Sequence, residues 1–162
     1  GNIMISRRSL LTTGSALAAL AATSTLGGRA MAATFPVTYT DAEWRARLTE
    51  NQYLVLRQNA TERPFSSPLH EEMREGIYTC VGCDQYVYDS KTKYYSDSGW
   101  PAFYEEVAEG IERGPDPVYG EILPEVHCAN CGSHMGHVFN DGPEPTGERH
   151  CINGLGLNFI PA

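Results

Sequence analysis

The stretch "IYTCVGCDQYVYD", residues 77–89, carries the pattern on which the fold prediction depends. Two short runs rich in β-branched and aromatic residues, 77–80 and 85–89, flank a C-x-x-C turn, so we expect two strands joined at this turn. A second C-x-x-C follows at Cys128 and Cys131, after the first at Cys80 and Cys83. Two such turns supply the four thiolates of a closed, tetrahedral zinc site.

The long segment between the two C-x-x-C turns predicts that several strands separate the halves of this site and that the metal joins their ends. Iron and a pair of disulfides are the alternatives to zinc. A disulfide within one C-x-x-C closes a very small ring and stabilises little, so zinc is favoured.

Strand signals continue toward the C-terminus, in short runs separated by Gly, Pro, Asp or Asn at 118–122, 125–128, 137–139, 149–153 and 155–160. The Pro- and Gly-rich segments 113–117 and 140–147 are predicted to be loops. Upstream, "TDAE" and "TENQ", beginning at Thr40 and Thr49, fit the capping box that begins a helix. The sequence therefore predicts a mainly β domain with short N-terminal helices that cover a sheet.

The chain has 162 residues, enough for one domain with a hydrophobic core. Its net charge is −8, and the first 33 residues contain three arginines and no acid, so the remainder is more acidic still. This charge argues against nucleic acid as a partner, because phosphate binding needs the opposite sign.

The N-terminus has the pattern of an export signal. An arginine pair at Arg7 and Arg8 precedes a mildly apolar stretch and an A-x-A site at 30–32. The arginine pair resembles a twin-arginine signal, which predicts a cleaved segment 1–33, a mature domain 34–162 and a periplasmic location. A membrane anchor is the alternative, but the stretch is rich in Thr, Ser and Gly, so we expect no stable membrane insertion.

The fifth cysteine, Cys151, stands alone in "RHCIN", residues 149–153. If this run is a strand, Arg149, Cys151 and Asn153 point to one face. A fixed positive charge beside a thiol lowers its pKa, and an amide can bond a charged intermediate, so this pattern indicates a reactive cysteine. The alternative is a buried, inert cysteine.

Several stretches together resemble the type B methionine sulfoxide reductases. They are the two C-x-x-C turns with "DAEWR" (41–45), "QYLVLRQNATERPF" (52–65), "SGWPAF" (98–103), "HMGHVFNDGPEPTG" (134–147) and "RHCIN". The resemblance implies two antiparallel sheets, a zinc held by the four cysteines, and reduction of the R epimer of methionine sulfoxide in proteins.

The same resemblance implies roles for single residues. Cys151 is expected to be the nucleophile, which is left as a sulfenic acid. Trp100 is expected to hold the substrate methyl group, and His134 and His137 to position and protonate the sulfoxide oxygen. The resemblance also implies that Arg149 stabilises the thiolate, that Asn153 belongs to the catalytic site, and that Phe139 and Asp141 take part in substrate binding.

The sequence departs from the family at Ser98, where many members carry a resolving cysteine. We therefore expect an external thiol or a thioredoxin-like protein to regenerate Cys151. Two other functions are alternatives to the reductase. One is a non-catalytic β-domain, stabilised by zinc, that binds a partner protein, and the other is a thiol-based redox sensor. The first has no need of "RHCIN", and the second has no need of Trp100 and the histidine pair.

Overall fold

The computed structural model describes residues 34–162, so the predicted export signal lies outside the described residues. The order of elements begins with α1 (Asp41–Arg47), α2 (Glu50–Gln58), the 3-10 turn η1 (Pro68–His70), β1 (Gly76–Cys80), β2 (Tyr86–Asp89) and η2 (Ser90–Thr92). It continues through β3 (Lys93–Tyr94), β4 (Ala102–Phe103), β5 (Ile111–Asp116), β6 (Gly120–Cys128) and β7 (His134–Phe139). It ends with β8 (Arg149–Ile152), η3 (Gly154–Gly156) and β9 (Leu157–Pro161).

The two helices begin where the capping boxes predicted them. Thr40 caps α1 and Thr49 caps α2, and in both helices the side chain at the third helical position bonds back to the cap amide. Each helix then buries its apolar side, with Trp44 on α1 and Leu56 on α2 among the buried residues. Helix α2 packs against β7 and η3, which confirms a helical cover on one sheet.

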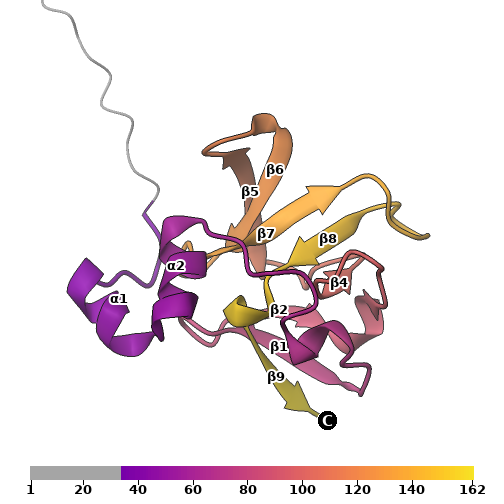
Figure 1. Ribbon diagram of the computed structural model, residues 1–162, viewed down its shortest axis with the longest axis horizontal. Helices are drawn as coiled ribbons and strands as arrows, with labels where there is room; N and C mark the ends of the chain where they lie inside the picture. The colour runs from indigo at the N-terminus through magenta and orange to yellow at the C-terminus, as the bar shows by residue number, and fades with distance from the viewer. Residues whose placement is uncertain (1–33) are drawn as a thin grey trace, which may run out of the picture. The chain divides into compact units, whose positions relative to one another are not determined.

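The strands form two antiparallel sheets, as the resemblance implied (Figure 1). One has three strands in the order β2-β1-β9, and the other has six in the order β3-β4-β8-β7-β6-β5. The core lies between them: Tyr88 of the small sheet stacks on Phe103 of the large one with ring centroids 4.3 Å apart, and Tyr78 meets Phe103 edge-on at 5.0 Å. No helix among residues 34–162 is long and apolar enough to span a membrane.

Of two predictions about the β5–β6 hairpin, one is wrong and one is confirmed in part. Residues 113–117 were expected to form a loop, but β5 runs through Pro115 to Asp116. Proline is tolerated there because β5 is the edge strand and its register shifts between Gly114 and Asp116. Residues 118–122 were expected to form a strand, and residues 120–122 do begin β6, whereas Val118 and Tyr119 belong to the turn between β5 and β6.

Candidate functional site

Strand β8 places Cys151 in the middle of the six-stranded sheet. Across the sheet, Cys151 is paired with Ala102 on β4 and with His137 on β7, and these two are paired with Tyr94 and Glu125 respectively. Residues paired across a ladder point to the same face, so the five side chains form one transverse row, Tyr94–Ala102–Cys151–His137–Glu125. Cys151 and His137 are both only partly buried, so this face of the sheet is accessible at the row.

A bulge brings the second histidine to the same face. His134 and His137 are three residues apart, so a regular strand would place them on opposite faces. The ladder to β6 pairs Val126 with Gly136 and the next residue, His127, with His134, which leaves Met135 as the extra residue on β7. The two imidazole rings consequently meet with centroids 5.4 Å apart.

Each imidazole is held by a carboxylate that the sequence analysis did not identify. His134 Nδ1 donates to Glu125 Oε1 over 2.6 Å, and His137 Nε2 donates to Asp116 Oδ2 over 2.7 Å. The ring nitrogens must be the donors because an ionised carboxylate can only accept. His134 is buried, and its Nε2 has no hydrogen-bond partner among residues 34–162.

Asp116 belongs to the turn of the β5–β6 hairpin as well as to the site. Its Oδ1 accepts from the backbone amides of Val118 and Tyr119, at 2.7 and 2.8 Å. Burial alone would raise the pKa of Asp116, but hydrogen bonds from His137 and from these amides hold it below its usual value. The histidine and the hairpin turn are therefore fixed to one another through a single ionised carboxylate.

Arg149, Asp141 and Phe139 come together beside Cys151. The guanidinium of Arg149 makes two hydrogen bonds to the Asp141 carboxylate, from Nε at 2.8 Å and from Nη2 at 3.0 Å. It also lies over the ring of Phe139, 4.3 Å from the centroid, and Phe139 is the cross-strand partner of Arg149. This geometry directs a fixed positive charge to the face of β8 that carries Cys151.

The pKa of Cys151 differs from the sequence expectation. Burial raises it above that of an ordinary thiol, while the charge of Arg149 and hydrogen bonds from Ser98 and Arg149 act to lower it. The positive charge of Arg149 lowers the pKa of Cys151, as expected. The pKa is nevertheless raised overall, because desolvation of the thiolate by burial is the largest influence.

Glu62 is a third residue that the sequence analysis missed, and it joins three parts of the site. Its carbonyl oxygen accepts from the indole Nε1 of Trp100 at 3.0 Å, and its carboxylate accepts from the amides of Gly154 and Leu155. Its own amide donates to Asn153 Oδ1 at 2.9 Å. The orientation of Trp100 and the start of η3 are thus set by one buried glutamate.

Asn153 is buried directly after β8, with its side-chain amide bonded to the backbone. Nδ2 donates to the carbonyl of Met135 at 3.0 Å, in addition to the bond that Oδ1 accepts from Glu62. These bonds connect the end of β8 to the bulged residue of β7. The structure therefore places Asn153 where it positions the two strands, in contrast to the expectation that it offers its amide to an intermediate.

A cavity of about 720 Å³ lies between α2, η1 and the η3–β9 segment. Glu62 lines it, but none of the predicted site residues does. Four of the predicted residues, Cys151, His137, Arg149 and Phe139, instead lie on one face of the large sheet.

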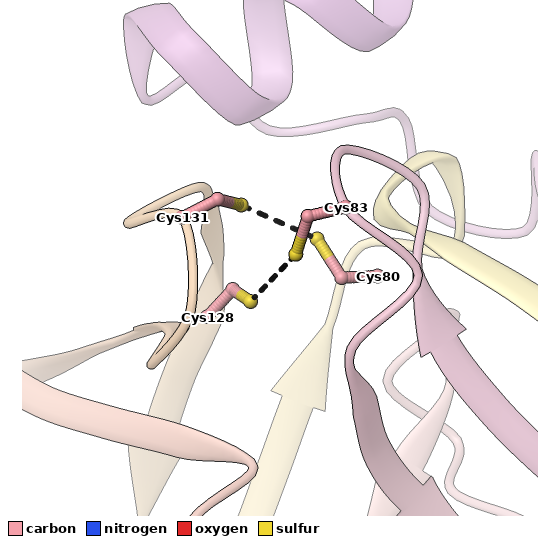
Figure 2. Close-up of side chains that lie close together, drawn as sticks. All are labelled: Cys80, Cys83, Cys128 and Cys131. Carbon is pink, nitrogen blue, oxygen red and sulfur yellow. Dashed lines mark hydrogen bonds between the residues drawn. The ribbon is translucent and has the colours of Figure 1, made fainter. Parts of the chain in front are cut away.

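The four remaining cysteines form one cluster where the ends of the two sheets meet. Figure 2 shows Cys80 and Cys83, from the β1–β2 turn, facing Cys128 and Cys131, from the β6–β7 turn. The Cys80–Cys131 sulfurs are 3.8 Å apart, the Cys83–Cys128 sulfurs are 3.6 Å apart, and all four lie within 4.8 Å of one another.

These distances fit a metal and not disulfides. A tetrahedron with metal–sulfur bonds of about 2.3 Å has edges of roughly 3.8 Å, whereas a disulfide needs about 2.05 Å. The amide of Gly82 donates to Cys80 Sγ at 3.3 Å, which suits a thiolate. The prediction that several strands separate the two halves of the cysteine cluster is confirmed. Strands β2 to β5 lie between the two C-x-x-C turns along the chain, and β6 leads into the second turn.

Comparisons with known proteins agree with these features. The SelR domain matches residues 48–161. The chain is 45% identical over 126 residues to a peptide methionine sulfoxide reductase MsrB of Agrobacterium fabrum, a match that covers 77% of this chain and 93% of the relative. Proteins of the same name from Methylibium petroleiphilum and Pseudomonas entomophila are 48% and 49% identical, over 75% and 74% of this chain and 89% and 92% of their own lengths.

Proposed function

This chain belongs to the type B methionine sulfoxide reductases, and on that premise we propose that Cys151 is the nucleophile with which it reduces methionine (R)-sulfoxide in proteins. It is an oxidoreductase, a peptide-methionine (R)-S-oxide reductase, and its role is protein repair under oxidative stress. The observation that carries the assignment of Cys151 is the cross-strand pair of Cys151 and His137, with Arg149 fixed on the same face.

The chemical step uses groups that the site already brings together. The Cys151 thiolate attacks the sulfoxide, the oxygen passes to the cysteine sulfur, and methionine leaves. The sulfoxide sulfur gains two electrons, the cysteine sulfur loses two, and one proton is taken up by the transferred oxygen to give the sulfenic acid. A sulfoxide oxygen leaves poorly until it is protonated, so the histidine pair beside Cys151 suits the role of proton donor.

The substrate methyl group is assigned to Trp100. An indole wall suits a small group that is half apolar, and the bond from Nε1 to the Glu62 carbonyl fixes the ring in one orientation. With the methyl group on Trp100, the R epimer places its oxygen toward the histidines, and the S epimer does not. Phe139 and Asp141 act through Arg149, whose guanidinium they hold.

Zinc is proposed as the metal of the four-cysteine cluster. Cys80, Cys83, Cys128 and Cys131 would hold it, and a closed set of four thiolates gives the metal a structural role. Held by these residues, it would link a turn of the small sheet to a turn of the large one and so support β7, which carries both histidines.

The reductant is proposed to come from outside the chain. The other four cysteines cluster with one another, and Ser98 occupies the position next to Gly99 and Trp100 where a resolving thiol is found in many relatives. An external thiol or a thioredoxin-like protein must then reach the sulfenic acid directly, which the partial exposure of Cys151 allows.

The location is proposed from the sequence alone. The arginine pair, the apolar stretch and the A-x-A site in residues 1–33 support export by a twin-arginine route, followed by cleavage and release of residues 34–162 into the periplasm.

Substitution of the nucleophile tests the proposed function. Cys151→Ser should abolish reduction of a blocked methionine (R)-sulfoxide while metal content and the free energy of unfolding stay at wild-type values. A variant that retains full activity would show that another group attacks the sulfoxide.

A further inference from the structure

Two side-chain polar atoms are buried without a hydrogen-bond partner among residues 34–162, and both belong to residues near Cys151. One is Nε2 of His134, and the other is the phenol oxygen of Tyr94. A buried hydroxyl without a partner destabilises the fold, because it loses its bonds to water and gains none in return. A phenylalanine would avoid this cost, so the Tyr94 hydroxyl needs an explanation.

The strand register shows where this hydroxyl lies. Tyr94 on β3 is paired with Ala102 on β4, and Ala102 is paired with Cys151 on β8. The three side chains therefore point to the same face, and two strand spacings of about 4.8 Å separate Tyr94 from Cys151. The intervening residue is an alanine, whose methyl group leaves room for a phenol to extend toward the cysteine.

The electrostatics of Tyr94 agree with this placement. Burial raises the pKa of Tyr94, and the charges of Arg149, Asp141 and Cys151 all act on its phenol. The next residue, Tyr95, lies just beyond the end of β3 and is 54% exposed. Tyr94 therefore faces the nucleophile and its positive partner, whereas its neighbour faces solvent.

We propose that Tyr94 is a further catalytic residue, which donates a hydrogen bond from its phenol to the oxygen that moves from methionine sulfoxide to Cys151. The inference rests on the proposed function and adds a donor on the β4 side of Cys151, opposite the histidines on the β7 side. Tyr94 keeps its proton throughout, so the electron and proton balance of the step is unchanged. The hydroxyl lacks a partner in the free protein because its partner arrives with the substrate.

The test compares Tyr94→Phe with the matched control Tyr95→Phe, each of which removes one phenol oxygen. Tyr94→Phe should lower kcat/KM for a blocked methionine (R)-sulfoxide about tenfold to hundredfold, the effect of losing one donor to a transferred oxygen. Its free energy of unfolding should stay the same or rise, because a buried unpaired hydroxyl is removed. Tyr95→Phe should match the wild type in both measurements.

A binding measurement separates this inference from the proposed function. In a Cys151→Ser background, which blocks turnover, Tyr94→Phe should weaken calorimetric binding of the blocked (R)-sulfoxide about fivefold to tenfold. Binding of blocked methionine, which has no oxygen on sulfur, should not change. Equal kcat/KM in Tyr94→Phe and wild type, a parallel loss of methionine binding, or a lower free energy of unfolding would each overturn the role of Tyr94. Failure of the wild type to reduce the sulfoxide would instead overturn the proposed function.

Discussion

Arg149 binds Asp141 through two hydrogen bonds, at 2.8 and 3.0 Å, and this pair holds the guanidinium on the face of β8 that carries Cys151. Asp141 lies in the loop that follows β7. The long side chain of Arg149 on β8 is therefore fixed by a residue from another segment. Stacking on the ring of Phe139 further restricts the conformations of the Arg149 side chain. The positive charge beside the nucleophile is therefore present before any substrate binds.

Loss of this charge should make Cys151 less reactive. Because burial already holds the pKa of Cys151 above the ordinary thiol value, its thiolate fraction increases with pH through and beyond the range of an unperturbed thiol. Arg149→Ala should raise the pKa further and slow alkylation of Cys151 by iodoacetamide about tenfold at fixed pH, if the shift is about one unit. Arg149→Lys keeps the charge and should lie between the two. Identical alkylation profiles in Arg149→Ala and wild type would contradict this role.

Removal of one zinc ligand should release the metal and loosen the joint between the sheets. Cys131→Ser leaves three thiolates, so elemental analysis should find less than one zinc per chain. The free energy of unfolding should fall by several kcal/mol, since metal binding of about 10–16 kcal/mol is coupled to folding in small zinc proteins. Cys151→Ser is the control, because it changes a cysteine outside the cluster and should keep its zinc. Well-folded wild-type protein without metal would refute the assignment.

Without a reductant, turnover should stop after one cycle. The other four cysteines cluster together as the proposed metal ligands, so we expect none of them to offer a free thiol to the sulfenic acid on Cys151. The chain should therefore release about one methionine and gain the mass of one oxygen atom. The Ser98 side chain lies within hydrogen-bonding reach of Cys151, so Ser98→Cys places a thiol beside the nucleophile. This variant should form an internal disulfide in place of the sulfenic acid. In the wild type, loss of two hydrogens, with a disulfide mapped from Cys151 to a zinc ligand, would disprove external recycling.

Export should depend on the arginine pair in residues 1–33. Replacing Arg7 and Arg8 with lysine keeps the charge but removes the twin-arginine pattern, so the protein should remain inside the cell. Fractionation of cells that produce each form, followed by N-terminal sequencing of the periplasmic product, measures this directly. Mature protein in the periplasm from the double variant would exclude the twin-arginine route.

Sequence reasoning located the residues of the site whose chemistry is visible in a short pattern. The C-x-x-C pairs and the capping boxes at Thr40 and Thr49 are local signals, and the structure brings them where expected. The isolated "RHCIN" is also a local signal, and it forms a strand as far as Ile152. The carboxylates Asp116 and Glu125 gave no such signal, because their role depends on the register between β6 and β7 and on the turn after β5. Which residues face one another across neighbouring strands cannot be predicted from the sequence of one strand alone.

The burial of Cys151 could not be predicted for the same reason. The arginine two residues earlier is visible in the sequence, but the packing that desolvates the thiol comes from strands distant along the chain. The proline in β5 led to the wrong prediction of a loop at residues 113–117. Only the sheet order shows that β5 is an edge strand, where proline is tolerated.

The proposed site on the face of β8 that carries Cys151 should be stereospecific and reduce only one epimer of methionine sulfoxide. The most direct test supplies separated R and S sulfoxides of a blocked methionine to the wild-type protein with excess dithiothreitol and measures the methionine formed. We expect rapid reduction of the R epimer and no detectable reduction of the S epimer. Equal turnover of both epimers, or preference for S, would contradict the geometry in which Trp100 and the histidine pair hold the methyl group and the oxygen.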